Sequence, residues 1–340
     1  MLHITNGDCT RDKLTEVEGE KIVWCDILHA GRAVKGIEES LHVRTAFHAE
    51  LGFGTFKECF AKIYDMYTEL NNAWVQHGEI VLWYEHDLFD QLNLIQLLEY
   101  FDSQYLKHQT ITLVNIEKYA RIPTFSGLGE LSPGELKKLF DARQAVSRAQ
   151  INLAQDAWRA FTSPHPREIE KFLQADSSAL PFLRAALIRF LQEFPSVENG
   201  LSKTEQNALS AMQNGARFPS EIFQAAQKME DAPFCGDTTF FALLMKLADG
   251  ENPLFMAEQG EIQAYFSAGF HQQQWILTPL GKSVLCGDVD WIRLRGMDKH
   301  LGGAHLHSGA TLWRWDEEKQ VLTTEDYVSN SLWNKRRDVC

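Results

Sequence analysis

A run of apolar residues that is followed directly by charged residues constrains the fold of this chain more than any other feature. Residues 80–84 read Ile-Val-Leu-Trp-Tyr, and four ionisable side chains follow within six positions: Glu85, His86, Asp87 and Asp90. A buried strand that ends in charge and leads at once into a helix is typical of the sheet edge where α/β proteins bind ligands. The sequence therefore indicates where a site lies, but it does not identify the reaction.

The first third of the chain predicts a Rossmann-like parallel sheet domain, placed at residues 1–128. Short apolar runs alternate there with helical patterns, as expected for a parallel sheet with helices on its faces. The sequence has neither a glycine-rich dinucleotide fingerprint nor a Walker loop, so it identifies no cofactor. A long amphipathic helix is expected at residues 53–76. The expected strands are residues 2–5, 21–25, 79–84 and 110–115.

The rest of the chain predicts a helical layer and then a winged-helix-like domain. A connecting helical region at residues 129–198 opens with Ser132, followed by proline and, three residues on, glutamate. Between residues 199 and 322, three short helices precede two strand-like runs, which is the order of a winged helix. Residues 323–340 are polar, and we expect a loosely held tail. The expected helices are 147–161, 166–174, 179–194, 202–212, 220–229 and 237–247.

Composition restricts the class of protein. The chain has 33 Lys and Arg against 46 Asp and Glu, a formal net charge of -13, which disfavours a general role on nucleic acid or anionic membranes. No apolar run approaches the roughly 18 residues of a membrane span, and the N-terminus lacks the features of a signal peptide. The six cysteines form no Cys-x-x-Cys pair and are interpreted as reduced thiols. We therefore expect a soluble cytoplasmic protein without a membrane partner.

Two interpretations are open for the charged residues after the third strand. If a helix starts near Leu88, Glu85 and His86 lie just before its N-terminus. Either residue can transfer protons there, and His86 can also bind a metal. Asp87 and Asp90 can bind a ligand, but they can equally cap the helix, because carboxylates at a helix N-terminus accept hydrogen bonds from free amides.

Other strand ends supply further candidates. Asn6, Gly7 and Asp8 follow the first strand, where glycine lets backbone amides approach a ligand, although this triplet is also an ordinary turn. Asp26 and His29 follow the second strand, where an aspartate is again often a cap or turn residue.

These side chains can converge, because the carboxyl ends of parallel strands share one edge of a sheet. Crowded carboxylates raise one another's pKa or recruit a cation. The set suits hydrolysis or group transfer, while its spacing matches no specific metal motif. The catalytic candidates are Glu85, His86, Asp8 and Asp26, and the ligand-binding candidates are Asn6, Gly7, His29, Asp87, Asp90 and Asn115.

Two further features are weaker. The loop at residues 125–132 carries two glycines before a capped helix and could cradle an anion, but nearby glutamates would repel one, so we favour a structural turn. Asp298, His300, His305 and His307 lie near a glycine pair and could bind metal. Histidines scattered through a loop usually form no such site.

The winged-helix interpretation invites a DNA-binding hypothesis, and charge argues against it. Between Gly200 and Asp290 the chain has five Lys and Arg against eleven Asp and Glu. The third expected helix, which would enter the major groove, carries Lys246 as its only basic residue. We therefore expect no specific DNA binding and favour a protein partner for this domain.

Several motifs together resemble the bacterial domain-of-unknown-function 1835 family, whose members often carry a second uncharacterised domain. The most specific is Trp83-Tyr84-Glu85-His86-Asp87, and the similarity spans residues 2–316. Where such proteins usually continue His-Glu-Gly-Pro, this chain has His29-Ala30-Gly31-Arg32. The resemblance implies a bacterial cytosolic protein of similar architecture and brings no established activity. The other motifs are residues 3–8, 24–29, 127–129 and 313–316.

Two functions from different classes remain open. The first is binding of a small polar ligand or nucleotide at the carboxyl edge of the sheet, in a protein that would be a hydrolase or transferase if it turns over its ligand. The second is a regulatory or adaptor protein whose winged helix binds a protein partner or DNA.

Overall fold

The computed structural model describes residues 1–104, 109–120, 122, 125, 127–309 and 311–325, and it divides into two compact units. The first comprises Met1–Ile188 with Gly302–Ala304, and the second comprises Arg189–Leu301 and the chain from His305 onward. The architecture is mixed α/β with a sheet that is mostly parallel. The finer division at residues 128, 198 and 322 stays a prediction.

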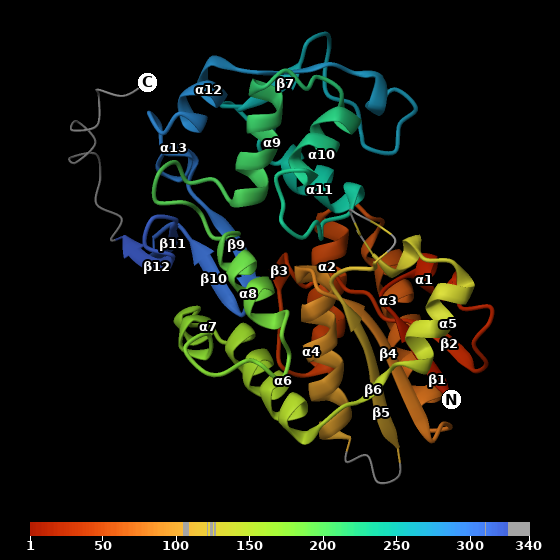
Figure 1. The fold of residues 1–340 in the computed structure, drawn as a ribbon. Coiled ribbons are helices and arrows are strands. Elements are labelled where there is room, and N and C mark those ends of the chain that lie inside the picture. Colours follow the sequence, from red (N-terminus) through yellow and green to blue (C-terminus); the bar gives the residue numbers. More distant parts are fainter. Residues whose placement is uncertain (105–108, 121, 123–124, 126, 310, 326–340) are drawn as a thin grey trace. The chain divides into compact units, whose positions relative to one another are not determined.

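A five-stranded sheet forms the centre of the first unit (Figure 1). Four of its strands are parallel, and the short edge strand β6 pairs antiparallel with β5. The four strands predicted from the sequence are confirmed to within two residues at each end, whereas β6 was not predicted. In spatial order the strands are β2 (Glu20–Val23), β1 (Leu2–Thr5), β4 (Glu79–Glu85), β5 (Thr110–Ile116) and β6 (Gln144–Ala145).

Strand β4 lies between β1 and β5, which explains its unbroken apolar sequence. Residues 80–84 are fully buried, because a central strand of a parallel sheet is covered on both faces. The register aligns Thr5 on β1 with Trp83, and Asn115 on β5 with Tyr84. The carboxyl ends of these three strands therefore meet at one edge.

Helices complete the first unit. The amphipathic segment predicted at residues 53–76 forms α3, which Thr55 and Glu58 cap reciprocally. The helices are α1 (Asp8–Lys13), α2 (Ile37–Glu50), α3 (Phe56–Trp74), α4 (Leu88–Ser103), η1 (Leu128–Glu130), α5 (Pro133–Asp141), α6 (Arg148–Phe161) and α7 (Arg167–Phe172), with α8 (Leu183–Leu191) crossing the unit boundary. The short strand β3 (Gly31–Arg32) precedes α2.

The second unit begins with three helices and an antiparallel strand pair, in the predicted order. They are α9 (Lys203–Gln213), α10 (Pro219–Gln227), α11 (Asp237–Met245), β7 (Phe255–Ala257) and β8 (Trp275–Leu277). This order alone does not confirm a winged helix.

The second unit ends in a small antiparallel sheet region that the sequence interpretation missed. Strand β12 pairs with β11 and continues to residue 325, past residue 323, where the tail was expected to begin, and residues 326–340 lie outside the described residues. The elements after β8 are α12 (Pro279–Leu285), α13 (Trp291–Arg295), β9 (Asp298–Gly302), β10 (Ala304–His307), β11 (Leu312–Asp316) and β12 (Val321–Glu325), and the 3-10 turn η2 (Phe270–Gln272) precedes β8. Among the described residues, no helix combines the length and apolar character that crossing a bilayer requires.

Candidate functional site

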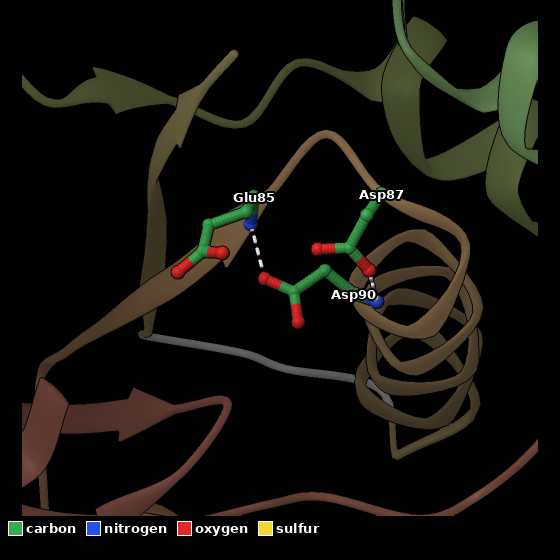
Figure 2. Close-up of side chains that lie close together, drawn as sticks. All are labelled: Glu85, Asp87 and Asp90. Carbon is green, nitrogen blue, oxygen red and sulfur yellow. Dashed lines mark hydrogen bonds between the residues drawn. The ribbon is translucent and has the colours of Figure 1, made fainter. Parts of the chain in front are cut away.

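Three acidic side chains meet where β4 gives way to α4 (Figure 2). We call Glu85, Asp87 and Asp90 the carboxylate cluster. One oxygen of each lies within 4.8 Å of the others, and the residues are only 5%, 6% and 1% exposed. Acidic residues are almost never this buried without a partner, so the cluster is the strongest candidate for a site in the first unit.

The carboxylates themselves shape the turn from strand to helix. Asp87 is the N-cap of α4, and its Oδ1 accepts a hydrogen bond from the Asp90 backbone N–H at 3.1 Å. The Glu85 backbone N–H donates in turn to Oδ2 of Asp90 (Figure 2). The capping interpretation is therefore confirmed for Asp87, whereas Asp90 accepts from the strand end instead.

Asn6, at the end of β1, joins the cluster from the neighbouring strand. Its side-chain Nδ2 donates to Oε1 of Glu85 at 3.2 Å and to Oδ2 of Asp90 at 3.0 Å. The Thr10 hydroxyl donates to the side-chain Oδ1 of Asn6 at 3.2 Å, which turns the side-chain nitrogen of Asn6 towards the acids. The predicted convergence of strand ends thus holds for β1 and β4.

The glycine-bearing loop before α5 also reaches Glu85. The Leu128 backbone N–H donates to Oε1 of Glu85 at 2.5 Å, and a Cβ on Gly127 would lie 2.6 Å from Oε2. A residue with a side chain cannot approach the carboxylate this closely. The loop therefore does accommodate an anionic group, but that group is a side chain of the protein itself, a possibility that the sequence interpretation missed.

Burial and mutual repulsion set the proton affinity of the cluster. Burial, followed by the charge of Asp87, raises the pKa of Glu85 to about 7. Burial raises the pKa of Asp87 to about 6, and burial with the charges of both neighbours holds the pKa of Asp90 well above its usual range. The cluster therefore retains protons at neutral pH unless a cation replaces them.

Asp26 belongs to a different set of contacts. Burial alone would raise its pKa, but the Arg44 guanidinium, 2.9 Å from Oδ2, and His48 outweigh this effect and hold the pKa well below its usual range. Arg44 is itself buried and donates to the carbonyls of Ile27 at 2.7 Å and Ala30 at 2.9 Å. This ion pair anchors the loop after β2, and Asp26 is not brought into the carboxylate cluster.

Three other candidates from the strand ends lie outside the cluster. The Asp8 side chain is 70% exposed on α1 and pairs with Arg11 at 2.6 Å. Gly7 contributes its carbonyl, which accepts from the Arg11 backbone N–H at 3.2 Å. His29 is buried, with its ring centroid 6.2 Å from that of Phe89 on α4.

His86 and Asn115 flank the cluster along the chain and across the sheet. His86 is half-buried, burial lowers its pKa, and its ring packs edge-on against Phe182 at 6.1 Å between centroids. The Asn115 side-chain amide donates to the backbone carbonyls of Tyr84 at 2.8 Å and Glu85 at 3.0 Å. Asn115 thus fixes the end of β4. Within the described part of the chain, His86 packs against Phe182 and makes no hydrogen bond to Glu85, Asp87 or Asp90.

Comparison of the sequence with protein-family models gives no match, and comparison with curated proteins gives none either. Membership of the family that the motifs resemble therefore stays a proposal, and the chemistry of the site is argued from its own residues.

The donor set of the cluster favours protons or a hard cation. Mg²⁺ and Ca²⁺ bind carboxylate oxygens, and Mg²⁺ often takes one or two carboxylates together with the phosphates of a ligand. Asn6 and the Leu128 amide offset part of the negative charge but carry no formal charge. The arrangement can therefore transfer a proton at Glu85 or hold a divalent cation.

Proposed function

We propose that the first unit binds a small polar ligand or nucleotide at the carboxyl edge of its sheet, together with a divalent cation held by the carboxylate cluster. The observation that carries this proposal is the convergence of three buried carboxylates within 4.8 Å, from the end of β4 and the first turn of α4. A phosphate would be repelled by three bare carboxylates, and a cation between them removes that repulsion.

The proposed reaction class is hydrolysis or group transfer, with Glu85 as the residue that moves the proton. Burial raises its pKa to about 7, and a general acid or base works best when its pKa lies near the working pH. His86 is the second candidate for this role, because its lowered pKa keeps the ring neutral and able to accept a proton. Asp87 and Asp90 are then the principal ligands of the cation, and the adjacent Glu85 carboxylate adds to its attraction when ionised.

Calorimetric titration of the purified protein with Mg²⁺, Mn²⁺ and Ca²⁺ tests the cation site. We expect binding to release protons, since the cation displaces them from the cluster, so the measured heat should change with the ionisation enthalpy of the buffer. The isosteric variants Glu85→Gln and Asp90→Asn should each weaken binding at least about tenfold. Asp65→Asn, an exposed aspartate on α3, is the matched control and should bind like the wild type.

A thermal-shift screen of nucleotides and other small polar compounds, with and without the cation, tests the ligand. A compound present at about a hundred times its dissociation constant should stabilise the wild type by about 2.7 kcal/mol. That gain should disappear in Asp90→Asn and persist in Asp65→Asn. Equal stabilisation of wild type and Asp90→Asn would place the ligand elsewhere and end this proposal.

A regulatory or adaptor role is the second candidate. It is favoured by the order of three helices and an antiparallel strand pair in the second unit, the order of winged helices that bind partners. Cross-linking and pull-down with the full chain test it. A partner captured equally by wild type and Lys246→Glu would favour protein recognition over DNA.

A further inference from the structure

Three histidines gather on a pair of neighbouring strands in the second unit. His300 lies on β9, whereas His305 and His307 lie on β10, and we call these three residues the histidine cluster. The two strands are hydrogen-bonded neighbours joined only by Gly303, so they run antiparallel, because a parallel pair needs a long crossover. The expectation of histidines scattered through a loop is wrong, since regular strands hold them in place.

The alternation of side chains along a strand puts these residues on one face. His305 and His307 are two positions apart on β10, as are Asp298 and His300 on β9. The intervening Leu306 is buried, whereas His305 is exposed and His307 is partly exposed. The histidine cluster therefore lies on the outward face of the strand pair, where an ion can reach it.

The rings are close to one another and to a carboxylate. The ring centroids of His300 and His305 lie 4.1 Å apart with an angle of 3° between the planes, and those of His305 and His307 lie 4.7 Å apart. Nε2 of His305 lies 2.7 Å from Oδ1 of Asp298. Three imidazole rings and one carboxylate therefore lie together on the outward face of this strand pair.

We propose that His300, His305 and His307 form a binding site for a transition-metal ion of the Zn²⁺ class, with Asp298 orienting His305. Imidazole nitrogens are the preferred ligands of Zn²⁺, Ni²⁺ and Cu²⁺, and three histidines leave a coordination position for water or an external ligand. Oδ1 of Asp298 accepts a hydrogen bond from Nε2–H of His305, which leaves the Nδ1 lone pair for the metal. The three rings would turn about their side-chain torsions on binding, so that each directs one nitrogen at the ion.

This site differs in chemistry from the carboxylate cluster of the first unit. Nitrogen ligands select borderline transition metals, whereas an all-oxygen set suits Mg²⁺ or Ca²⁺. The two proposals can therefore fail separately, and a variant of either site reports on that site alone.

Titration of the tag-free full chain with Zn²⁺, and with Co²⁺ as a spectroscopic probe, tests the histidine cluster. We expect about one equivalent of Zn²⁺ to bind tightly in the Asp90→Asn background, where the carboxylate cluster binds cations at least about tenfold more weakly. Bound Co²⁺ should show visible absorption typical of nitrogen ligands, and millimolar Mg²⁺ should not displace it.

Substitutions on the outward face distinguish this site from adventitious binding. His305→Ala and His307→Ala should each lower Zn²⁺ affinity at least about tenfold, and Asp298→Asn should lower it less. His165→Ala, an exposed histidine in the first unit, is the control and should leave affinity unchanged. Failure of the Asp90→Asn protein to take up Zn²⁺, or equal affinity in His305→Ala and His165→Ala, would overturn the proposal.

Discussion

Glu85, Asp87 and Asp90 bury three acidic groups side by side, so that Glu85 and Asp90 ionise less readily because of burial and of the acids beside them. Asn6 and the Leu128 amide stabilise the charged forms, but their hydrogen bonds do not outweigh burial. At this scale the cluster destabilises the fold when it is fully ionised. A residue pattern that costs stability in this way is typical of a functional site.

The first prediction concerns Glu85 and pH. Its pKa is raised to about 7 in the folded protein and is ordinary in the unfolded chain, so between these values the folded state binds more protons. The free energy of unfolding should therefore fall as pH rises from about 4.5 to above 7. Glu85→Gln should lose this part of the slope, which amounts to a few kcal/mol at about 1.4 kcal/mol for each unit of pKa.

Urea denaturation of wild type and Glu85→Gln at several pH values measures this effect. The comparison must be between the two proteins, because His3 acts in the opposite direction. Burial lowers the pKa of His3 to about 4, so its contribution is present above pH 6.5 and is lost as pH falls through about 4. His3 is common to both proteins and cancels in the difference. Parallel pH profiles for the two would contradict the raised pKa.

Single residues also show where prediction from the sequence stops. The acids after β4 could be identified because a local pattern, an apolar run followed by charge, marks them. Asp26 has the same pattern, yet its carboxylate pairs with Arg44, eighteen residues further on. Nothing local to Asp26 distinguishes an anchoring ion pair from a catalytic acid, since the partner arrives only when α2 packs against the loop.

At the scale of elements, the turn from β4 to α4 carries all three residues of the carboxylate cluster. The strand end and the helix start were predicted to within about a residue, because an unbroken apolar run ends there in charged residues of the kind that cap helices. Strands β3, β6, β9, β10, β11 and β12 were not predicted. They are short, and β12 reads Val-Leu-Thr-Thr-Glu, a sequence that becomes a strand only by pairing with β11.

The second prediction separates capping from charge at Asp87. Asp87→Asn keeps an oxygen that can accept from the Asp90 N–H but removes one of three repelling charges. We expect this variant to be more stable than the wild type at pH 8, where the cluster is most ionised. Asp87→Ala loses the cap as well and should be about 1 kcal/mol less stable than Asp87→Asn. Chemical denaturation of all three proteins at pH 5 and pH 8 measures the effect of the charge and the effect of the helix cap on the free energy of unfolding.

Loss of stability in Asp87→Asn at pH 8 would show that Asp87 serves the helix through its charge. The same experiment repeated with saturating divalent cation is informative, because the cation removes the repulsion. Under that condition the wild type should be the more stable protein.

The third prediction concerns the loop before α5. A Cβ on Gly127 would meet Oε2 of Glu85 at 2.6 Å, so Gly127→Ala must displace either the loop or the carboxylate. We expect a destabilisation of about 1–3 kcal/mol and weaker cation binding, because Glu85 loses the Leu128 amide. Gly78→Ala is the control, since a Cβ there meets no atom within 4 Å. Unchanged cation binding in Gly127→Ala would separate this loop from the site.

At the scale of the whole molecule, the net charge argues against binding to nucleic acid. The chain carries a formal charge of -13. Within residues 237–247, the segment of α11, Lys246 is the only basic residue. Binding to DNA gains most of its free energy from phosphate neutralisation, which this composition does not supply. The boundary between the two compact units could not be predicted from the sequence. It falls between Ile188 and Arg189, inside helix α8, where no turn or linker composition marks it.

The fourth prediction is that the full chain does not bind duplex DNA at 50–150 mM salt, as measured by fluorescence anisotropy with a labelled duplex of mixed sequence. Lys246→Glu should therefore give the same flat titration. A salt-dependent affinity that Lys246→Glu weakens would instead support the regulatory interpretation and a winged helix that enters a groove.

The position of Asn6 has a consequence for how this protein ages. Asparagine followed by glycine is prone to deamidation, in which the next backbone nitrogen attacks the side-chain carbonyl. Here Thr10, Glu85 and Asp90 hold the Asn6 amide in place, which hinders the rotation that the attack requires. Conversion of Asn6 to aspartate would replace the donor between two acids by a fourth carboxylate. The hydrogen bonds that build the cluster therefore also slow the deamidation of Asn6. The deamidation rate of Asn6 in the folded protein would then report how often these hydrogen bonds open.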